Sequence, residues 1–71
     1  MLLSIVIPCY NEYDSIMQTY RTITNIIKAE SDKEGYSYEL IFIDDGSNDE
    51  TLKIIQNFCA SDANSKYLKL Q

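Results

Sequence analysis

Runs of apolar residues alternate with amphipathic segments along the 71 residues of this chain. Two runs, near residues 3–8 and 38–44, are almost continuously apolar and rich in β-branched side chains, which is typical of strands covered on both faces. A third segment, near 66–70, alternates between polar and apolar residues as a short strand does. The stretches between these strands predict helices near 13–32 and 48–60.

The first helix is predicted from apolar residues that recur on one helical face, namely Ile16, Tyr20, Ile23 and Ile27. Asn11 is its candidate cap, Asp14 lies near its positive end, and Gly35 is its expected stop. In the second helix, Ser47 and Glu50 have the spacing of a capping box, with Glu50 at the third helical position. Its inner face comprises Leu52, Ile54, Ile55, Phe58 and Cys59.

The element order is therefore β-α-β-α-β, which places the chain in the α/β class. Two right-handed crossovers give three parallel strands in the spatial order 3-2-1. The first strand then lies at an edge of the sheet although it is strongly apolar, and such an edge invites pairing with another chain. We therefore expect self-association through the exposed first strand.

Composition excludes several classes of function. The net charge of −5 disfavours nucleic acid as a partner, because binding its backbone needs a basic face. No apolar run approaches the roughly 20 residues of a membrane helix, so we expect no membrane segment. The chain has no histidine and only two cysteines, Cys9 and Cys59, which argues against zinc, a disulfide framework and cysteine catalysis. Cys9 is interpreted as a small packing residue, and a cytoplasmic location is expected.

Two short motifs follow the first two strands, where open α/β sheets bind their ligands. The first is Pro8-Cys9-Tyr10-Asn11-Glu12, in which the Tyr10 ring could stack on a nucleotide base or simply pack over the strand end. The second is Asp44-Asp45-Gly46-Ser47, whose carboxylates could accept hydrogen bonds from a base or serve only as turn residues. Glu12 could hold a polar ligand group or complement the helix dipole.

Together the segments SIVIPCYNE and YELIFIDDGSNDETLKII resemble the beginning of family 2 glycosyltransferases. The polyprenyl-phosphate branch, with its dolichyl-phosphate mannose synthases and undecaprenyl-phosphate sugar transferases, is the most similar. The resemblance implies a three-layer, Rossmann-like GT-A fold, of which residues 1–71 form the N-terminal, nucleotide-sugar-binding half. It also implies that Pro8 and Tyr10 flank the base, that Asp45 accepts a hydrogen bond from it, that Ile43 lines the pocket, and that Glu12 lies at the rim.

The resemblance further implies a hexosyltransferase that moves a sugar from a UDP- or GDP-linked donor to a polyprenyl phosphate or a growing cell-envelope polysaccharide. Such an enzyme would use Mg²⁺ or Mn²⁺ at the cytoplasmic face of a membrane. The family's metal-binding Asp-x-Asp motif and its acceptor half are not among these residues, so no catalytic or metal-binding residue is assigned and the chain alone is expected to be inactive. The alternative is a non-catalytic α/β module that self-associates or binds nucleotide weakly.

Overall fold

Residues 1–11, 13–46 and 49–70 are described by the computed structural model. All five predicted elements are present within these residues, and their ends lie within three residues of the expected positions. They are β1 (Leu2–Cys9), α1 (Ile16–Glu34), β2 (Ser37–Asp45), α2 (Thr51–Ser61) and β3 (Ser65–Leu70).

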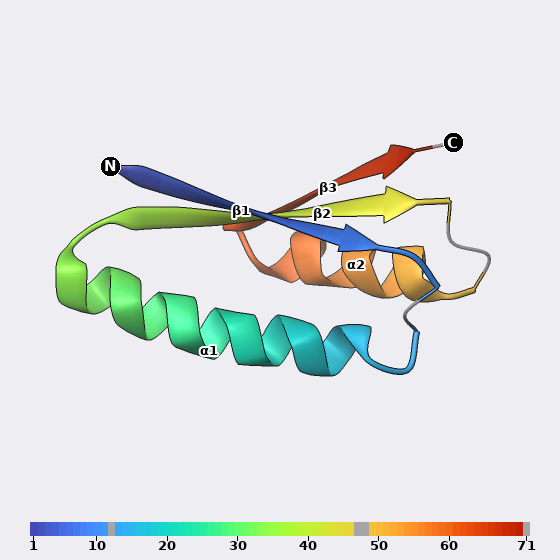
Figure 1. The fold of residues 1–71 in the computed structure, drawn as a ribbon, viewed down its shortest axis with the longest axis horizontal. Coiled ribbons are helices and arrows are strands. Elements are labelled where there is room, and N and C mark those ends of the chain that lie inside the picture. Colours follow the sequence, from blue (N-terminus) through green and yellow to red (C-terminus); the bar gives the residue numbers. More distant parts are fainter. Residues whose placement is uncertain (12, 47–48, 71) are drawn as a thin grey trace.

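The three strands form one parallel sheet in the order β1-β2-β3, which is the predicted order read from the opposite edge. All three arrows in Figure 1 point the same way, and the loops that leave β1 and β2 lie at the same end of the sheet. In the register, Ile5 of β1 lies beside Leu40 of β2, and Leu40 lies beside Ser65 of β3. The carboxyl ends of β1 and β2 are therefore neighbours.

Both helices cover the same face of the sheet (Figure 1). Successive right-handed crossovers that advance in the same direction across a sheet must place their helices on one side. The prediction that β1 and β2 are covered on both faces is therefore wrong for the described residues, which cover one face only. On the open face Val6 is 56% exposed and Leu68 is 57% exposed. The described residues form two layers, one sheet and one layer of helices, of the three-layer fold.

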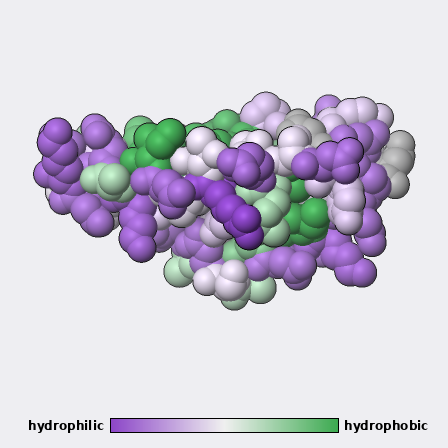
Figure 2. All heavy atoms as spheres, turned by 90° about the horizontal axis from the view of Figure 1, so that it is seen from below, coloured by the Kyte–Doolittle hydropathy of each residue, from purple (hydrophilic) through white to green (hydrophobic). Residues whose placement is uncertain are grey.

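The core lies between the sheet and the helices. It is built from Ile7, Cys9, Ile16, Ile27, Leu40, Phe42, Ile55 and Phe58. The Tyr20 ring of α1 stacks on the Phe58 ring of α2 with centroids 4.0 Å apart, and the Phe42 ring of β2 lies 5.7 Å from Phe58. The predicted inner face of α1 and the packing role of Cys9 are confirmed. In α2 the prediction holds for Ile54, Ile55, Phe58 and Cys59, whereas Leu52 is not part of the core. Seen from the helix side, the surface is mostly hydrophilic with separate apolar patches (Figure 2).

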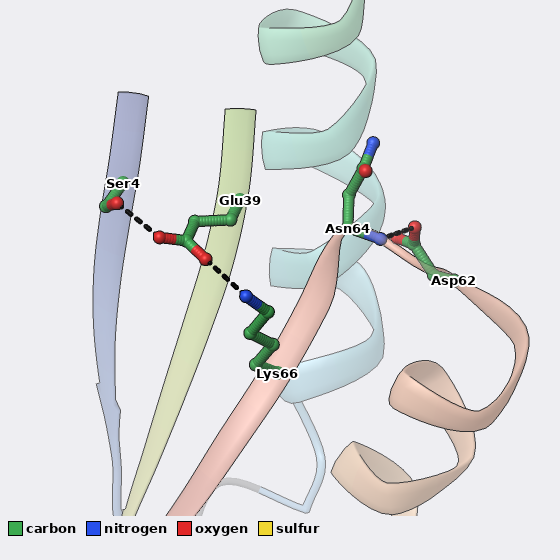
Figure 3. A network of polar contacts seen from close by, with 5 residues as sticks. All are labelled: Ser4, Glu39, Asp62, Asn64 and Lys66. Atoms are coloured by element: carbon green, nitrogen blue, oxygen red, sulfur yellow. Dashed lines mark hydrogen bonds and ion pairs between the residues drawn. The ribbon is translucent and has the colours of Figure 1, made fainter. Parts of the chain in front are cut away.

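A polar ladder crosses the open face near the amino ends of the strands (Figure 3). Glu39 of β2 accepts hydrogen bonds from the Ser4 hydroxyl of β1 at 2.5 Å and from the Lys66 ammonium of β3 at 2.8 Å. The pKa of Glu39 is lowered mainly by the hydrogen bond from Lys66 and to a lesser extent by the hydrogen bond from Ser4. The Lys66 side chain is largely exposed to water, so the ion pair contributes little stability. The ladder nevertheless places one polar side chain of each strand on the open face. Apolar residues of that face lie on both sides of the ladder, with Leu2 at the amino end of β1 and Val6 toward the carboxyl end.

Asp62 joins the two helices and the start of β3. Its carboxylate accepts hydrogen bonds from the Tyr20 hydroxyl at 2.7 Å, the Ser65 hydroxyl at 2.9 Å and the Asn64 backbone N–H at 3.0 Å. The pKa of the Tyr20 hydroxyl is raised mainly by burial and also by its hydrogen bond to Asp62, so the hydroxyl remains a donor at neutral pH. These contacts fix the distance between α1 and the end of α2.

The ends of α1 confirm one prediction and correct another. Gly35 ends the helix in a left-handed conformation (φ 75°), and its N–H donates to the Ser31 carbonyl. Asn11 does not cap α1, because its own backbone is left-handed (φ 48°) and the chain makes a further turn before Ile16. Asp14 consequently lies outside the first turn of the helix, which contains no acidic residue.

The start of α2 also differs from the expected capping box. Glu50 occupies the cap position rather than the third helical position, and its side chain makes no capping hydrogen bond. Ser47, the predicted cap, lies outside the described residues. No helix among the described residues is both long enough and apolar enough to cross a membrane.

Candidate functional site

The predicted site lies where β1 and β2 end. Cys9, the last residue of β1, is beside Asp44, and Asp45 follows as the last residue of β2. Tyr10 comes directly after β1, and its side chain is 54% exposed, so the ring is accessible to a ligand. The structure thus brings both motifs to one end of the sheet, as the sequence predicts for parallel strands.

Three apolar residues form a row across the open face at this end of the sheet. Pro8 of β1 is the register partner of Ile43 in β2, and Ile43 is the partner of Leu68 in β3. Side chains of adjacent residues in parallel register lie on the same face. Asp45, two residues beyond Ile43, shares this face and is exposed. Three of the predicted site residues, Pro8, Ile43 and Asp45, therefore lie together on the open face.

The two aspartates at the tip of β2 face opposite sides of the sheet, because side chains alternate along a strand. Asp44 is fully buried on the helix side, and neither of its carboxylate oxygens has a hydrogen-bond partner among residues 1–11, 13–46 and 49–70. Asp45 is exposed on the open face, two residues beyond Ile43, the middle residue of the apolar row. This difference selects Asp45 over Asp44 as the residue able to meet a ligand on the open face.

Glu12, predicted at the rim of the pocket, lies outside the described residues. Two residues that sequence reasoning missed lie beside the site. Leu68 extends the apolar row. The alternation of residues 66–70 places Leu68 on this face once the pairing of β3 with β2 is known. Asp49 contacts the loop between β1 and α1 as well as the start of α2. The Asp-x-Thr spacing before a helix could have indicated it, because an aspartate side chain often accepts a hydrogen bond from the backbone two residues later.

Asp49 accepts hydrogen bonds from three donors. They are the backbone N–H of Tyr13 at 3.3 Å, the backbone N–H of Thr51 at 3.0 Å, and the Thr51 hydroxyl. The hydrogen bond from the Thr51 hydroxyl is the main cause that lowers the pKa of Asp49, and the backbone N–H groups lower it further. Thr51, the first residue of α2, is fully buried, so this contact also satisfies a buried hydroxyl.

Neither metal nor thiol chemistry is supported by the described part of the chain. Nowhere in it do three His, Cys, Asp or Glu side chains come together as a cation site, so these residues do not fit the divalent metal that the resemblance implies. Burial raises the pKa of the Cys59 thiol, which keeps it protonated and a poor nucleophile. A hollow of about 240 Å³ is lined by Lys28 and Ser31 of α1 and by Tyr38 near the amino end of β2, away from the strand ends that carry the site.

Comparison with known proteins gives consistent matches. The family model described as Glycosyl transferase family 2 matches residues 4–71. An undecaprenyl-phosphate 4-deoxy-4-formamido-L-arabinose transferase of Pseudomonas fluorescens (strain SBW25) is 37% identical over 87% of this chain and 17% of its own length. A prophage bactoprenol glucosyl transferase homolog of Escherichia coli (strain K12) is 37% identical over 87% of this chain and 19% of its own length.

A eukaryotic protein is similar as well. A dolichyl-phosphate beta-glucosyltransferase of Dictyostelium discoideum is 33% identical over 97% of this chain and 22% of its own length. The chain thus spans about a fifth of the length of these relatives.

Proposed function

The chain belongs to glycosyltransferase family 2, and from this premise we propose that residues 1–71 hold the base of a nucleotide-sugar in an enzyme that transfers the sugar to an acceptor. The family implies the nucleotide-sugar donor. The assignment of the base site rests on one observation: Pro8, Ile43 and Asp45 share the open face, and the exposed Tyr10 directly follows β1.

These residues can recognise a base without taking part in bond breaking. Pro8 and Ile43 offer an apolar floor, and the Tyr10 ring offers a planar surface for stacking. Asp45 offers an anionic acceptor for the ring N–H of uracil or guanine. Glu12 is proposed as a rim residue on the family resemblance alone. The segment would thus bind and orient the donor, and the transfer would be carried out by residues of the enzyme outside it.

The acceptor we propose is a polyprenyl phosphate, and the sugar a hexose. Relatives that match most of the chain are named for transfer to undecaprenyl phosphate, bactoprenol and dolichyl phosphate. Work at such a carrier would place the enzyme at the cytoplasmic face of a membrane, in cell-envelope polysaccharide synthesis for a bacterial enzyme. The 71 residues alone would be inactive, because transfer needs stabilisation of the diphosphate leaving group and the described residues fit no cation.

The test compares two chemically identical substitutions in the full-length enzyme. Asp45→Asn removes the anionic acceptor, and we expect it to weaken UDP or GDP binding by about tenfold. Asp44→Asn makes the same change one residue earlier, on the buried helix side, and is expected to leave binding within about twofold of the wild type. Isothermal titration calorimetry with each nucleotide measures both. Equal loss in the two variants, or no loss in Asp45→Asn, would contradict the assignment.

A second candidate role is self-association of the 71-residue chain. It is favoured by the exposed apolar residues of the open face and by the position of β1 at the sheet edge. We expect a dimer at about 100 μM, since a partner could cover the apolar row or pair with β1. Sedimentation velocity measures the association, and Val6→Lys should weaken it by placing a charge on the open face. A stable monomer at that concentration would contradict this role.

A further inference from the structure

Asp49 joins the two loops that leave the carboxyl ends of β1 and β2. Its Oδ2 accepts a hydrogen bond from the Tyr13 N–H, which lies in the loop between β1 and α1. Its Oδ1 accepts from the N–H and the hydroxyl of Thr51, where α2 begins. A single carboxylate therefore contacts backbone that is 36 residues away in the chain as well as backbone 2 residues away.

The contact with Thr51 has a local cause. The first N–H groups of a helix have no partner within the helix, and an aspartate just before the helix can satisfy one of them. Glu50, at the cap position of α2, makes no such side-chain bond. Asp49 supplies it, and one carboxylate oxygen is sufficient for this purpose.

The contact with Tyr13 serves no helix end, because α1 begins only at Ile16. It ties the β1–α1 loop to the β2–α2 loop. The first of these loops contains Tyr10, and the second follows Asp45, the last residue of β2. In the proposed site Tyr10 stacks on the base and Asp45 accepts a hydrogen bond from it. The separation of these loops would then decide whether one base can stack on the Tyr10 ring and reach the Asp45 carboxylate at the same time.

We propose that Asp49 is a positioning residue of the nucleotide site, which holds the Tyr10 loop and the Asp45 loop at the separation that base binding requires. As far as binding is concerned, the inference rests on the proposed function. The lowered pKa of Asp49 agrees with it, since an ionised carboxylate has both oxygens available as acceptors.

The sharpest variant is Asp49→Asn. The asparagine side chain keeps one acceptor oxygen, whereas its amide nitrogen can only donate. It can therefore cap α2 but can no longer hold Tyr13 at the same time. We expect the amide of Tyr13 to exchange about tenfold faster in this variant, while the amide of Thr51 keeps its protection. In Asp49→Ala both amides are expected to exchange faster.

The experiment uses the full-length enzyme, with amide exchange followed by mass spectrometry of peptides or by NMR, and with UDP and GDP titrations on the same samples. We expect both Asp49 variants to bind nucleotide about tenfold more weakly than the wild type. In turnover, KM for the nucleotide-sugar should rise while kcat changes little, because the base is remote from the bond that breaks. The matched control is Asp14→Ala, which removes an exposed carboxylate from the same β1–α1 loop. This variant should change neither the amide exchange nor the nucleotide affinity.

The outcomes separate the inference from the proposed function. Unchanged exchange at Tyr13 in Asp49→Asn overturns the inference, as does faster exchange together with wild-type nucleotide affinity. A wild-type enzyme that binds neither UDP nor GDP overturns the proposed function instead. The exchange measurement needs no ligand, so in that case it still tests whether Asp49 holds the β1–α1 loop to the β2–α2 loop.

Discussion

Replacing Phe42 with alanine is expected to lower the free energy of unfolding of the 71-residue chain by about 3–5 kcal/mol. Phe42 is fully buried at the centre of the middle strand, and its ring contacts those of Tyr20 and Phe58. Alanine would lose these contacts and leave a cavity that the surrounding sheet cannot close. Native proteins are stable by only about 5–15 kcal/mol, and a chain this small lies toward the lower end. The substitution should therefore leave much of the population unfolded.

Urea unfolding followed by circular dichroism measures this effect. Leu68→Ala is the matched control, because Leu68 is apolar but 57% exposed on the open face, and its loss should cost well under half as much. Phe42→Leu, which keeps most of the volume, should fall between the two. A Phe42→Ala chain as stable as Leu68→Ala would mean that the core does not lie between the sheet and the helices.

The sequence predicts the elements of this fold well because each depends on a local period. The stripe of Ile16, Tyr20, Ile23 and Ile27 specifies a helical face, and these residues pack on the sheet. The ends of the helices are predicted less well, because neighbouring polar residues compete for the same N–H groups. At α2 the capping-box spacing favours Ser47 and the Asp-x-Thr spacing favours Asp49, and in the structure the Thr51 N–H donates to Asp49.

Burial of a strand is harder to predict, because an apolar run does not reveal what covers it. β1 has the composition of a strand covered on both faces, yet Val6 and its neighbours on the open face are exposed. The two aspartates illustrate the reverse case. Alternation predicts that Asp44 and Asp45 face opposite sides, but only the position of Phe42 in the core shows which of them faces the helices.

Replacing Tyr10 with alanine in the full-length enzyme is expected to weaken UDP or GDP binding by roughly 1–3 kcal/mol, the usual contribution of one aromatic ring that stacks on a base. The Tyr10 side chain is 54% exposed at the end of β1, so its removal should cost the fold little. Tyr10→Phe keeps the ring and should bind within about twofold of the wild type. Calorimetric titration measures all three proteins.

Tyr13 provides the matched control for the loss of a ring. Its side chain is 51% exposed in the same loop, and Tyr13→Ala keeps the backbone N–H that donates to Asp49. We expect this variant to bind nucleotide as the wild type does. If Tyr10→Ala also binds normally while Asp45→Asn binds weakly, the base is held by hydrogen bonding alone, and Tyr10 only packs over the end of β1. If Tyr10→Ala and Tyr10→Phe are equally weak, the hydroxyl and not the ring makes the contact, because only the hydroxyl is lost in both.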